Sequence, residues 1–213
     1  MTNRPQLFFD FDGTLCDSLP GIENGLQHAL IENGLPKLSS ESLKKMIGIP
    51  LRKSLGMFVF EEHEMGSELY ESTIRSFRKY YAEKGAFESK LYANVKGAIA
   101  QLSQSHELYL VTAKPEDLAI SMLEHHGLIS YFSGVGGFRG EPNFAKSRLI
   151  ASFLKDENAF MIGDKPEDIQ AGIDQNVQTI AVTYGYGSLE ELRESNPNYL
   201  INAFEDVLPL LKL

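Results

Sequence analysis

The chain has 213 residues, of which 43% are hydrophobic and 23% are charged, and its formal net charge is −9. This length fits one large domain or one domain that carries a smaller insert, and the negative charge disfavours nucleic acid and membrane surfaces as partners. No apolar run approaches the ~20 residues of a membrane helix, no signal peptide is recognisable, and Cys16 is the one cysteine. We therefore expect a cytoplasmic globular protein without an intrachain disulfide or a cysteine metal cluster.

The first expected element is a buried strand over residues 6–11, because this short run is apolar and rich in aromatic residues. The sequence Asp12-Gly13-Thr14 then predicts a tight turn. Over residues 17–84, apolar residues recur at helical spacing, and breaks at glycine and proline divide the stretch into about four helices without a strand. The first strand has no other strand nearby in the sequence with which it could pair. We therefore interpret the helical block as an insert.

After Gly85 the pattern alternates between helices and strands. Helices are expected over residues 95–105, from Pro115, from Ala145, over 166–175, from Ser188 and at the C-terminal end. Strands are expected over 108–111, near Val135, and over 159–162, 179–182 and 199–201. This alternation predicts a parallel sheet covered on both faces. The expected architecture is an α/β, Rossmann-like core over residues 1–16 and 85–213, with an all-helical domain over residues 17–84.

Charged residues follow the expected strands at one edge of the sheet, where open α/β sheets bind their ligands. Asp10 and Asp12 follow the first strand, and Asp164 and Asp168 follow the strand over 159–162. Residues two apart in a strand project to the same side, so the two carboxylates of the first pair repel unless a cation lies between them or one is protonated. Acidic side chains gathered in this way predict a site for a hard cation such as Mg²⁺.

Four short motifs carry a resemblance to a known family. They are Asp10-Phe11-Asp12-Gly13-Thr14-Leu15, Thr112 after an apolar strand, Lys146 at the start of a helix, and Gly163-Asp164-Lys165-Pro166-Glu167-Asp168. Their order and spacing resemble the haloacid dehalogenase (HAD) superfamily, and residues 17–84 lie where the helical cap of that family is inserted. Three further segments, Asp17-Ser18, Gly48-Ile49-Pro50-Leu51 and Leu91-Tyr92, resemble the phosphoglycolate-phosphatase-like branch.

The resemblance implies a Mg²⁺-dependent phosphomonoesterase and a role for each matching residue. Asp10 would be the nucleophile that forms an aspartyl-phosphate, and Asp12 would donate a proton and later accept one. Mg²⁺ would bind Asp10, the backbone carbonyl of Asp12 and Asp164. Asp168 would either support the metal through a water or orient the lysine. Thr112 and Lys146 would hold the phosphoryl oxygens. Further substrate contacts are expected from Gly13, Thr14, Ala113, Lys114 and Arg52.

Two of these cations have alternative interpretations. Lys114 lies two residues beyond Thr112 and would share its side of a continued strand, but Pro115 follows, and the lysine side chain could equally point to solvent. We therefore expect Lys146 to be the phosphate clamp, between Asp10 and Asp164. Arg52 follows a break between helices, where it would either attract an anionic substrate tail or lie solvated at a helix start.

The expected substrate is a small phosphorylated metabolite, with phosphoglycolate and a nucleoside monophosphate as the leading candidates by resemblance. A phosphomutase and a non-catalytic phosphate-binding or regulatory protein are alternatives on the same fold. A haloacid dehalogenase is disfavoured, because it needs neither Asp12 nor Asp164. The oligomeric state, monomer or homodimer, stays open, and Cys16 is interpreted as a buried thiol without a basic partner nearby in the sequence.

Overall fold

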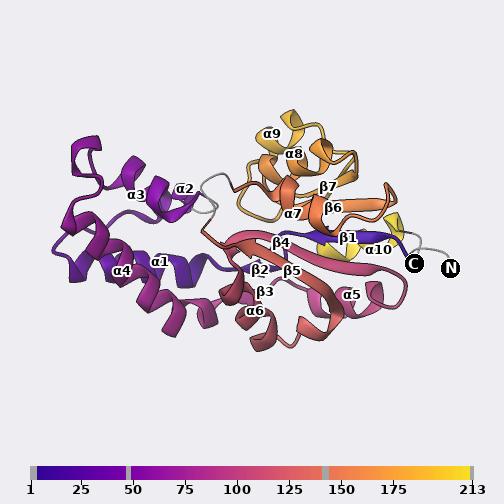
Figure 1. The fold of residues 1–213 in the computed structure, drawn as a ribbon, viewed down its shortest axis with the longest axis horizontal. Helices are drawn as coiled ribbons and strands as arrows, with labels where there is room; N and C mark the ends of the chain where they lie inside the picture. The colour runs from indigo at the N-terminus through magenta and orange to yellow at the C-terminus, as the bar shows by residue number, and fades with distance from the viewer. Residues whose placement is uncertain (1–3, 47–48, 141–143, 212–213) are drawn as a thin grey trace. The chain divides into compact units, whose positions relative to one another are not determined.

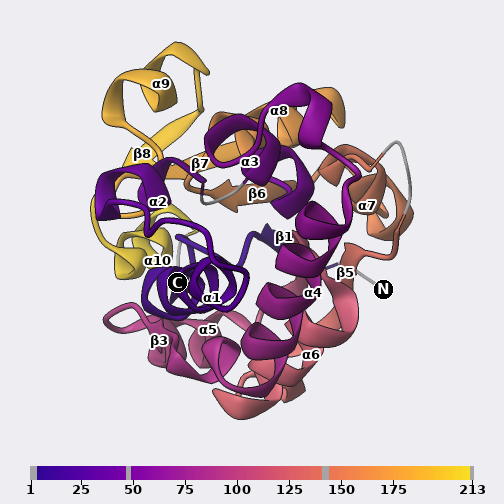
Figure 2. The same ribbon diagram turned by 90° about the vertical axis from the view of Figure 1, so that its left-hand side faces the viewer.

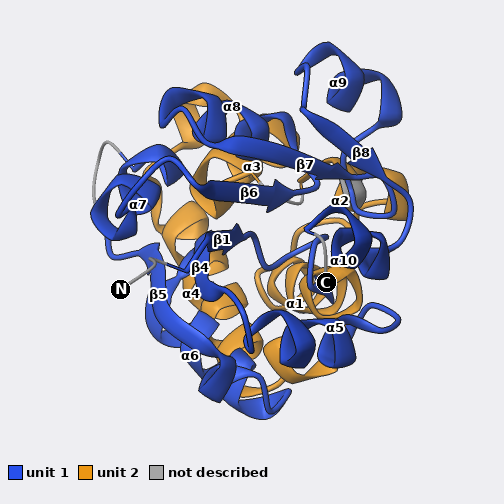
Figure 3. Cartoon of the chain, turned by 90° about the vertical axis from the view of Figure 1, so that its right-hand side faces the viewer, with its two compact units in different colours: residues 1–17, 91–213 blue, residues 18–90 orange. Residues whose placement is uncertain are grey.

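Figure 1 shows the fold in a computed structural model, which describes residues 4–46, 49–140 and 144–211. Gly48, which belongs to one of the phosphoglycolate-phosphatase-like segments, lies outside the described residues. The chain divides into two compact units, shown in different colours in Figure 3. Residues 1–17 and 91–213 form the core unit, and residues 18–90 form the helical unit.

The second boundary between the units lies at Lys90, whereas the sequence suggested Lys84. The intervening residues include a 3₁₀ helix, η2 (Gly85–Glu88), that packs against helices α1 (Leu19–Glu32) and α4 (Glu68–Glu83). Gly21 and Gly85 approach so closely that a Cβ on Gly21 would lie 1.8 Å from the Gly85 carbonyl oxygen. This backbone contact joins η2 to the helical unit.

Six strands of the core unit form one parallel sheet in the order β5-β4-β1-β6-β7-β8. They are β1 (Gln6–Phe9), β4 (Glu107–Pro115), β5 (Phe132–Phe138), β6 (Ala159–Gly163), β7 (Gln178–Val182) and β8 (Tyr199–Ile201). These are the six strands that the sequence predicts, and the α/β, Rossmann-like fold is confirmed. Two further short strands, β2 (Cys16–Asp17) and β3 (Lys90–Leu91), form a separate sheet beside the points where the chain leaves and re-enters the core.

The strand order reverses at β1. From β1 the chain adds β4 and β5 on one side, and then returns to the other side of β1 to add β6, β7 and β8. In a parallel sheet such a reversal opens a crevice at the carboxyl ends of the strands. The topology therefore places the candidate site where β1, β4 and β6 end.

Helices cover both faces of the sheet, as Figure 3 shows for the core unit. On one face, Phe8 and Met161 pack with Ile150 of α7 and Ala171 of α8 in a buried apolar cluster. On the other face, α6 packs on β4 and β5, and α5 lies beside the 3₁₀ helix η4 (Phe204–Asp206), whose Phe204 contacts Phe9. The core helices are α5 (Val95–Leu102), α6 (Glu116–His125), α7 (Lys146–Phe153), α8 (Pro166–Asp174), α9 (Leu189–Glu194) and α10 (Val207–Leu210).

Strand β1 ends at Phe9, two residues before the predicted end at Phe11. The amide of Asp10 still donates to the carbonyl of Ile162 in β6, at 3.0 Å, but the carbonyl of Phe11 accepts from the turn amides of Leu15 and Cys16. The chain therefore leaves the sheet immediately after Asp10. The predicted tight turn at Asp12-Gly13-Thr14 is confirmed.

The helical unit consists of α1, α2 (Ser40–Met46), α3 (Leu51–Phe58) and α4, together with 3₁₀ helices. Four α-helices were expected in this block, and four are present in the described residues. Figure 2 shows these four helices in a second view. Leu26, Leu43, Leu55 and Ile74 contribute to a separate apolar cluster that the four helices share. In the described part of the chain, no helix combines the length and apolar character that crossing a membrane requires.

Candidate active site

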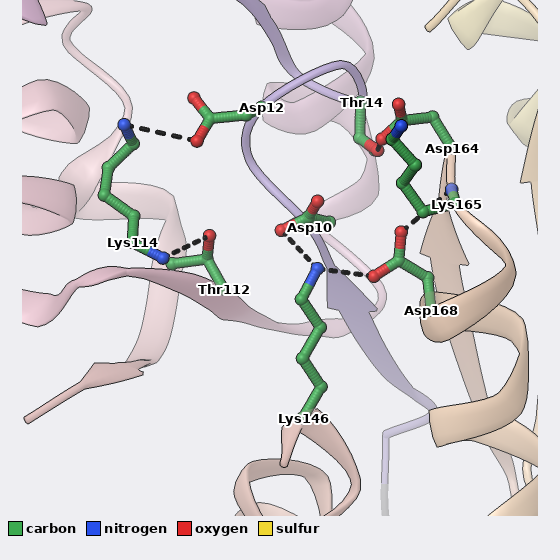
Figure 4. A network of polar contacts seen from close by, with 9 residues as sticks. All are labelled: Asp10, Asp12, Thr14, Thr112, Lys114, Lys146, Asp164, Lys165 and Asp168. Carbon is green, nitrogen blue, oxygen red and sulfur yellow. Dashed lines mark hydrogen bonds and ion pairs between the residues drawn. The ribbon is translucent and has the colours of Figure 1, made fainter. Parts of the chain in front are cut away.

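Asp10 occupies the centre of the site, at the carboxyl end of the central strand β1 (Figure 4). Its side chain is almost fully buried, and the residue is 5% exposed. The Oδ1 atom lies 2.9 Å from Nζ of Lys146. A buried carboxylate is costly without a partner of opposite charge, and Lys146 supplies that partner for Asp10.

Asp164 and Asp168 come from the end of β6 and the first turn of α8. Pro166 starts α8, and the Lys165 amide donates to Oδ2 of Asp168 at 3.1 Å, which fixes this carboxylate at the helix N-terminus. The two oxygens of Asp164 accept hydrogen bonds from the Thr14 hydroxyl, at 3.0 Å, and from the Tyr186 amide, at 2.8 Å. Both acids are fully buried and face Asp10.

Lys146, the first residue of α7, lies between two carboxylates. Its Nζ is 2.9 Å from Asp10 and 2.5 Å from Oδ1 of Asp168. The sequence suggested Asp164 as the second partner, and that pairing is wrong. The oxygens of Asp164 are already directed to Thr14 and Tyr186, whereas Asp168 offers Oδ1 on the side of Lys146.

Asp12 and Lys114 form a second ion pair, with Nζ of the lysine 3.2 Å from Oδ2 of the acid. Figure 4 shows Asp12 directed toward Lys114 and Asp10 directed toward Lys146. The expected projection of both acids to one side required a strand through residue 12, and β1 ends earlier. Lys114 lies within β4 with its side chain 5% exposed, so the alternative of a solvated Lys114 is wrong.

Thr112 and Ala113 lie on β4 beside the acidic cluster. Thr112 is buried, and its hydroxyl accepts a hydrogen bond from the Lys114 amide at 3.3 Å. Ala113 is half-buried. Gly13 adopts a φ of +83°, and a Cβ built on it would lie 2.2 Å from Oδ2 of Asp164. Only glycine fits so close to Asp164 in this turn.

Arg52 belongs to α3 of the helical unit, where it pairs with Glu71 of α4. Its Nη1 and Nη2 atoms lie 2.5 and 2.7 Å from the two carboxylate oxygens, and its side chain is 50% exposed. The expected contact of Arg52 with substrate stays a prediction.

The electrostatics of the cluster favour a cation beyond the two lysines. Burial, and then the charge of Asp10, raise the pKa of Asp164. Burial is also the first reason that the pKa of Asp168 is raised, although Lys146 opposes the effect. Burial lowers the pKa of Lys146, but the charges of Asp10 and Asp168 outweigh it and raise this pKa above its usual value. Lys146 is therefore charged, and Asp164 and Asp168 hold protons more tightly than usual when no further cation is bound.

The acids fit a magnesium ion. Asp10, Asp164 and Asp168 each offer a carboxylate oxygen, and these three atoms lie within 4.8 Å of one another. Four carboxylates, including Asp12, face two ammonium groups, which leaves the ionised site an excess of two negative charges. Mg²⁺ prefers oxygen ligands and carries two positive charges, so it matches both the donor atoms and the charge of this site. The Asp12 carboxylate is paired with Lys114. The resemblance to the HAD family implies that the backbone carbonyl of Asp12 would contact the metal.

Two tyrosines beside the site were missed by the sequence interpretation. Tyr184 donates from its hydroxyl to the Thr14 carbonyl at 2.7 Å, and Tyr186 contacts Asp164 and Asp17. The available signal was a glycine- and tyrosine-rich segment directly after β7, at the same sheet edge as Asp164. The interpretation of Cys16 as a buried thiol is confirmed. The structure adds that His126 Nε2 lies 3.6 Å from the Cys16 Sγ, although the two residues are 110 apart in the sequence.

Comparisons with known proteins identify the family of the chain. A family model described as "Haloacid dehalogenase-like hydrolase" matches residues 7–182. The chain is 30% identical to a phosphoglycolate phosphatase of Aliivibrio fischeri and 28% identical to one of Vibrio parahaemolyticus; the alignments cover 96% and 95% of this chain and 95% and 94% of those proteins.

Solved structures resemble the whole chain. A "predicted phosphoglycolate phosphatase" from Haemophilus somnus superposes with a TM-score of 0.88 at 27% identity, and a "predicted phosphatase" from Clostridium acetobutylicum with 0.86 at 30% identity. Each comparison covers 100% of both chains. The chain belongs to the haloacid dehalogenase-like hydrolases and groups with the phosphatases of this family.

Proposed function

We propose that this phosphatase is Mg²⁺-dependent and hydrolyses the monoester of a small metabolite through a phosphorylated Asp10. One observation carries the proposal: a buried carboxylate, Asp10, lies beside Lys146 and two further buried carboxylates at the ligand-binding edge of the sheet. This combination holds an anionic nucleophile, a fixed cation and a set of oxygen ligands within one small site. An attack on phosphorus needs all three.

In the first proposed step, an oxygen of Asp10 attacks the phosphorus, and the bond from phosphorus to the ester oxygen breaks. The leaving oxygen takes a proton from Asp12, and the phosphoryl group stays on Asp10. In the second step, a water attacks the phosphorus and gives a proton to Asp12, the bond from phosphorus to the Asp10 oxygen breaks, and inorganic phosphate leaves. The Oδ1 atom of Asp12 is buried and has no hydrogen-bond partner among the described residues. An oxygen in this state suits a group that exchanges a proton with a substrate.

Asp10, Asp164 and the Asp12 carbonyl would hold the magnesium ion, and Asp168 would orient Lys146. When bound, Mg²⁺ neutralises phosphoryl charge and aligns the phosphate with the nucleophile. Lys146 and the Thr112 hydroxyl would bind the phosphoryl oxygens. Gly13 and Thr14 shape the turn beside them, and Ala113 and Lys114 would meet the substrate from β4.

The proposed substrate is phosphoglycolate or a nucleoside monophosphate. Relatives named phosphoglycolate phosphatase support the first choice. The helical unit is inserted directly after the nucleophile turn, and we propose that it acts as a cap in which Arg52 contributes to substrate choice. We further propose that the enzyme works in the cytoplasm, as its single cysteine suggests.

The proposal is tested by measuring inorganic phosphate released from an aryl phosphate, from 2-phosphoglycolate and from nucleoside monophosphates, with Mg²⁺ and with a chelator. We expect release that depends on Mg²⁺ and a clear preference among the natural esters. A second measurement separates hydrolysis from phosphoryl transfer, because a phosphomutase would convert a sugar phosphate to its isomer. Release unaffected by the chelator would reject the metal dependence, and isomerisation without release would reject hydrolysis.

A further inference from the structure

The segment between β7 and α9, residues 183–187, makes direct contact with the metal-binding side of the site. A Cβ built on Gly185 would lie 2.3 Å from Cβ of Asp164 and 2.4 Å from the carbonyl oxygen of Gly13. The amide of Tyr186 donates to Oδ2 of Asp164 at 2.8 Å. This loop therefore fixes one oxygen of a proposed magnesium ligand through its backbone.

Residues of the same loop form hydrogen bonds with the segment at which the chain leaves the core unit. Tyr184 donates to the carbonyl of Thr14 at 2.7 Å, and Tyr186 donates to Oδ1 of Asp17 at 2.8 Å. Asp17 is the last residue of the core unit before the chain enters the helical unit. Burial raises the pKa of the Tyr186 phenol, so its hydroxyl stays protonated and remains a donor.

We infer that Tyr186 is a positioning residue that couples the magnesium ligand Asp164 to the exit segment at Asp17. The Tyr186 amide donates to Asp164, and the Tyr186 hydroxyl donates to Asp17. A displacement of Asp164 would therefore also displace the hydroxyl that is bonded to Asp17. The inference rests on the proposed magnesium site and goes beyond it, because it assigns a consequence of metal binding to a residue outside the four motifs.

The test uses Tyr186→Phe, which removes the hydroxyl and keeps both the ring and the amide contact with Asp164. Tyr109→Phe is a matched control, because the Tyr109 hydroxyl also donates to a carboxylate at 2.8 Å, that of Glu107 at the other end of β4. The readout is amide hydrogen exchange of the full chain, with and without Mg²⁺ alone, in two segments: residues 183–187 and residues 16–18.

In the unmodified protein and in the control variant, we expect Mg²⁺ to slow exchange in both segments. In Tyr186→Phe we expect the slowing to persist in residues 183–187 and to fall severalfold in residues 16–18. An unchanged response of residues 16–18 in Tyr186→Phe would overturn the inference. If Mg²⁺ slows exchange nowhere around Asp164 in the unmodified protein, the metal site fails and the inference fails with it.

A kinetic test distinguishes positioning from a merely structural role. Loss of one charge-assisted hydrogen bond predicts that Tyr186→Phe lowers kcat about tenfold, while the half-saturating Mg²⁺ concentration stays within about twofold of the unmodified value. The double variant Tyr186→Phe with Asp17→Ala should lose no more than the more damaging single change. A lower melting temperature with unchanged kcat, or losses that simply multiply, would reject the coupling. If the unmodified enzyme hydrolyses no phosphomonoester, the proposed reaction fails while the exchange experiment still decides this inference.

Discussion

The two units of the molecule have different interiors. In the helical unit, the buried polar side chains of Ser54 and Thr73 donate to carbonyls of their own helices. The cluster that the four helices share consists of aliphatic and aromatic residues. Ion pairs of the helical unit, such as Arg75–Glu68 and Lys45–Glu41, lie on its surface. In the core unit, four charged residues are buried together at the carboxyl edge of the sheet: Asp10, Lys114, Asp164 and Asp168.

This difference shows where the chain tolerates unfavourable burial. Charged groups in an interior are costly unless paired, and a cluster with excess negative charge opposes folding when it is fully ionised. An apolar cluster of the same size would be more stable. The cost is understandable where the charges act on a substrate, so we expect the chemistry to depend on the core unit and substrate choice to depend on the helical unit.

The strongest test of this comparison is Asp10→Asn. The amide has nearly the same shape but is not nucleophilic, so we expect phosphate release to fall by ~10³-fold or more. The fold should persist, because one negative charge is removed from an acidic cluster. Steady-state kinetics and thermal unfolding check both parts. A variant that keeps a sizeable fraction of the rate would exclude Asp10 as the nucleophile.

The two lysines of the site, Lys146 and Lys114, should differ. Lys146→Ala removes the partner of Asp10 and Asp168, so we expect kcat/KM to fall ~10²–10³-fold on every substrate and stability to fall by about 3–5 kcal/mol. Lys114→Ala leaves only Asp12, whose side chain is 20% exposed, and should have a milder, substrate-dependent effect. The measurements are kcat/KM on an aryl and an alkyl phosphate and unfolding in urea. The reverse ranking would make Lys114 the clamp.

Asp12→Ala should separate good from poor leaving groups. An alkyl phosphate needs a proton on its leaving oxygen, whereas an activated aryl phosphate needs little help in that step. We expect the first substrate to lose ~10²–10⁴-fold in kcat/KM and the second clearly less. Equal losses on both substrates would contradict the acid role and would leave Asp12 as a partner of Lys114 only.

The smallest effect is expected in the helical unit. Arg52→Ala should raise KM for the natural ester severalfold and spare an aryl phosphate, while stability changes by about 1 kcal/mol or less because the Arg52–Glu71 pair is exposed. Glu71→Ala is the matched control, since it breaks the same pair and keeps the cation. If both variants leave every KM unchanged, Arg52 does not contact the substrate and forms only the surface ion pair with Glu71.

The sequence by itself determined the layout of the chain. Alternating apolar runs and helical spacing are local properties, so the six strands, the helical insert and the turn after Asp10 could be predicted from neighbouring residues. The placement of Asp10, Asp12, Asp164 and Asp168 at the ends of β1 and β6 followed from the same pattern, because parallel strands carry their ligand sites at one edge.

Only the tertiary structure decided which side chains meet. Lys146 pairs with Asp168 instead of Asp164, whose two oxygens accept hydrogen bonds from Thr14 and Tyr186. Tyr186 reaches Asp17 across 169 residues of sequence. Such contacts depend on which side chains the folded backbone brings within hydrogen-bond distance, and hydrophobic periodicity carries no information about these distances.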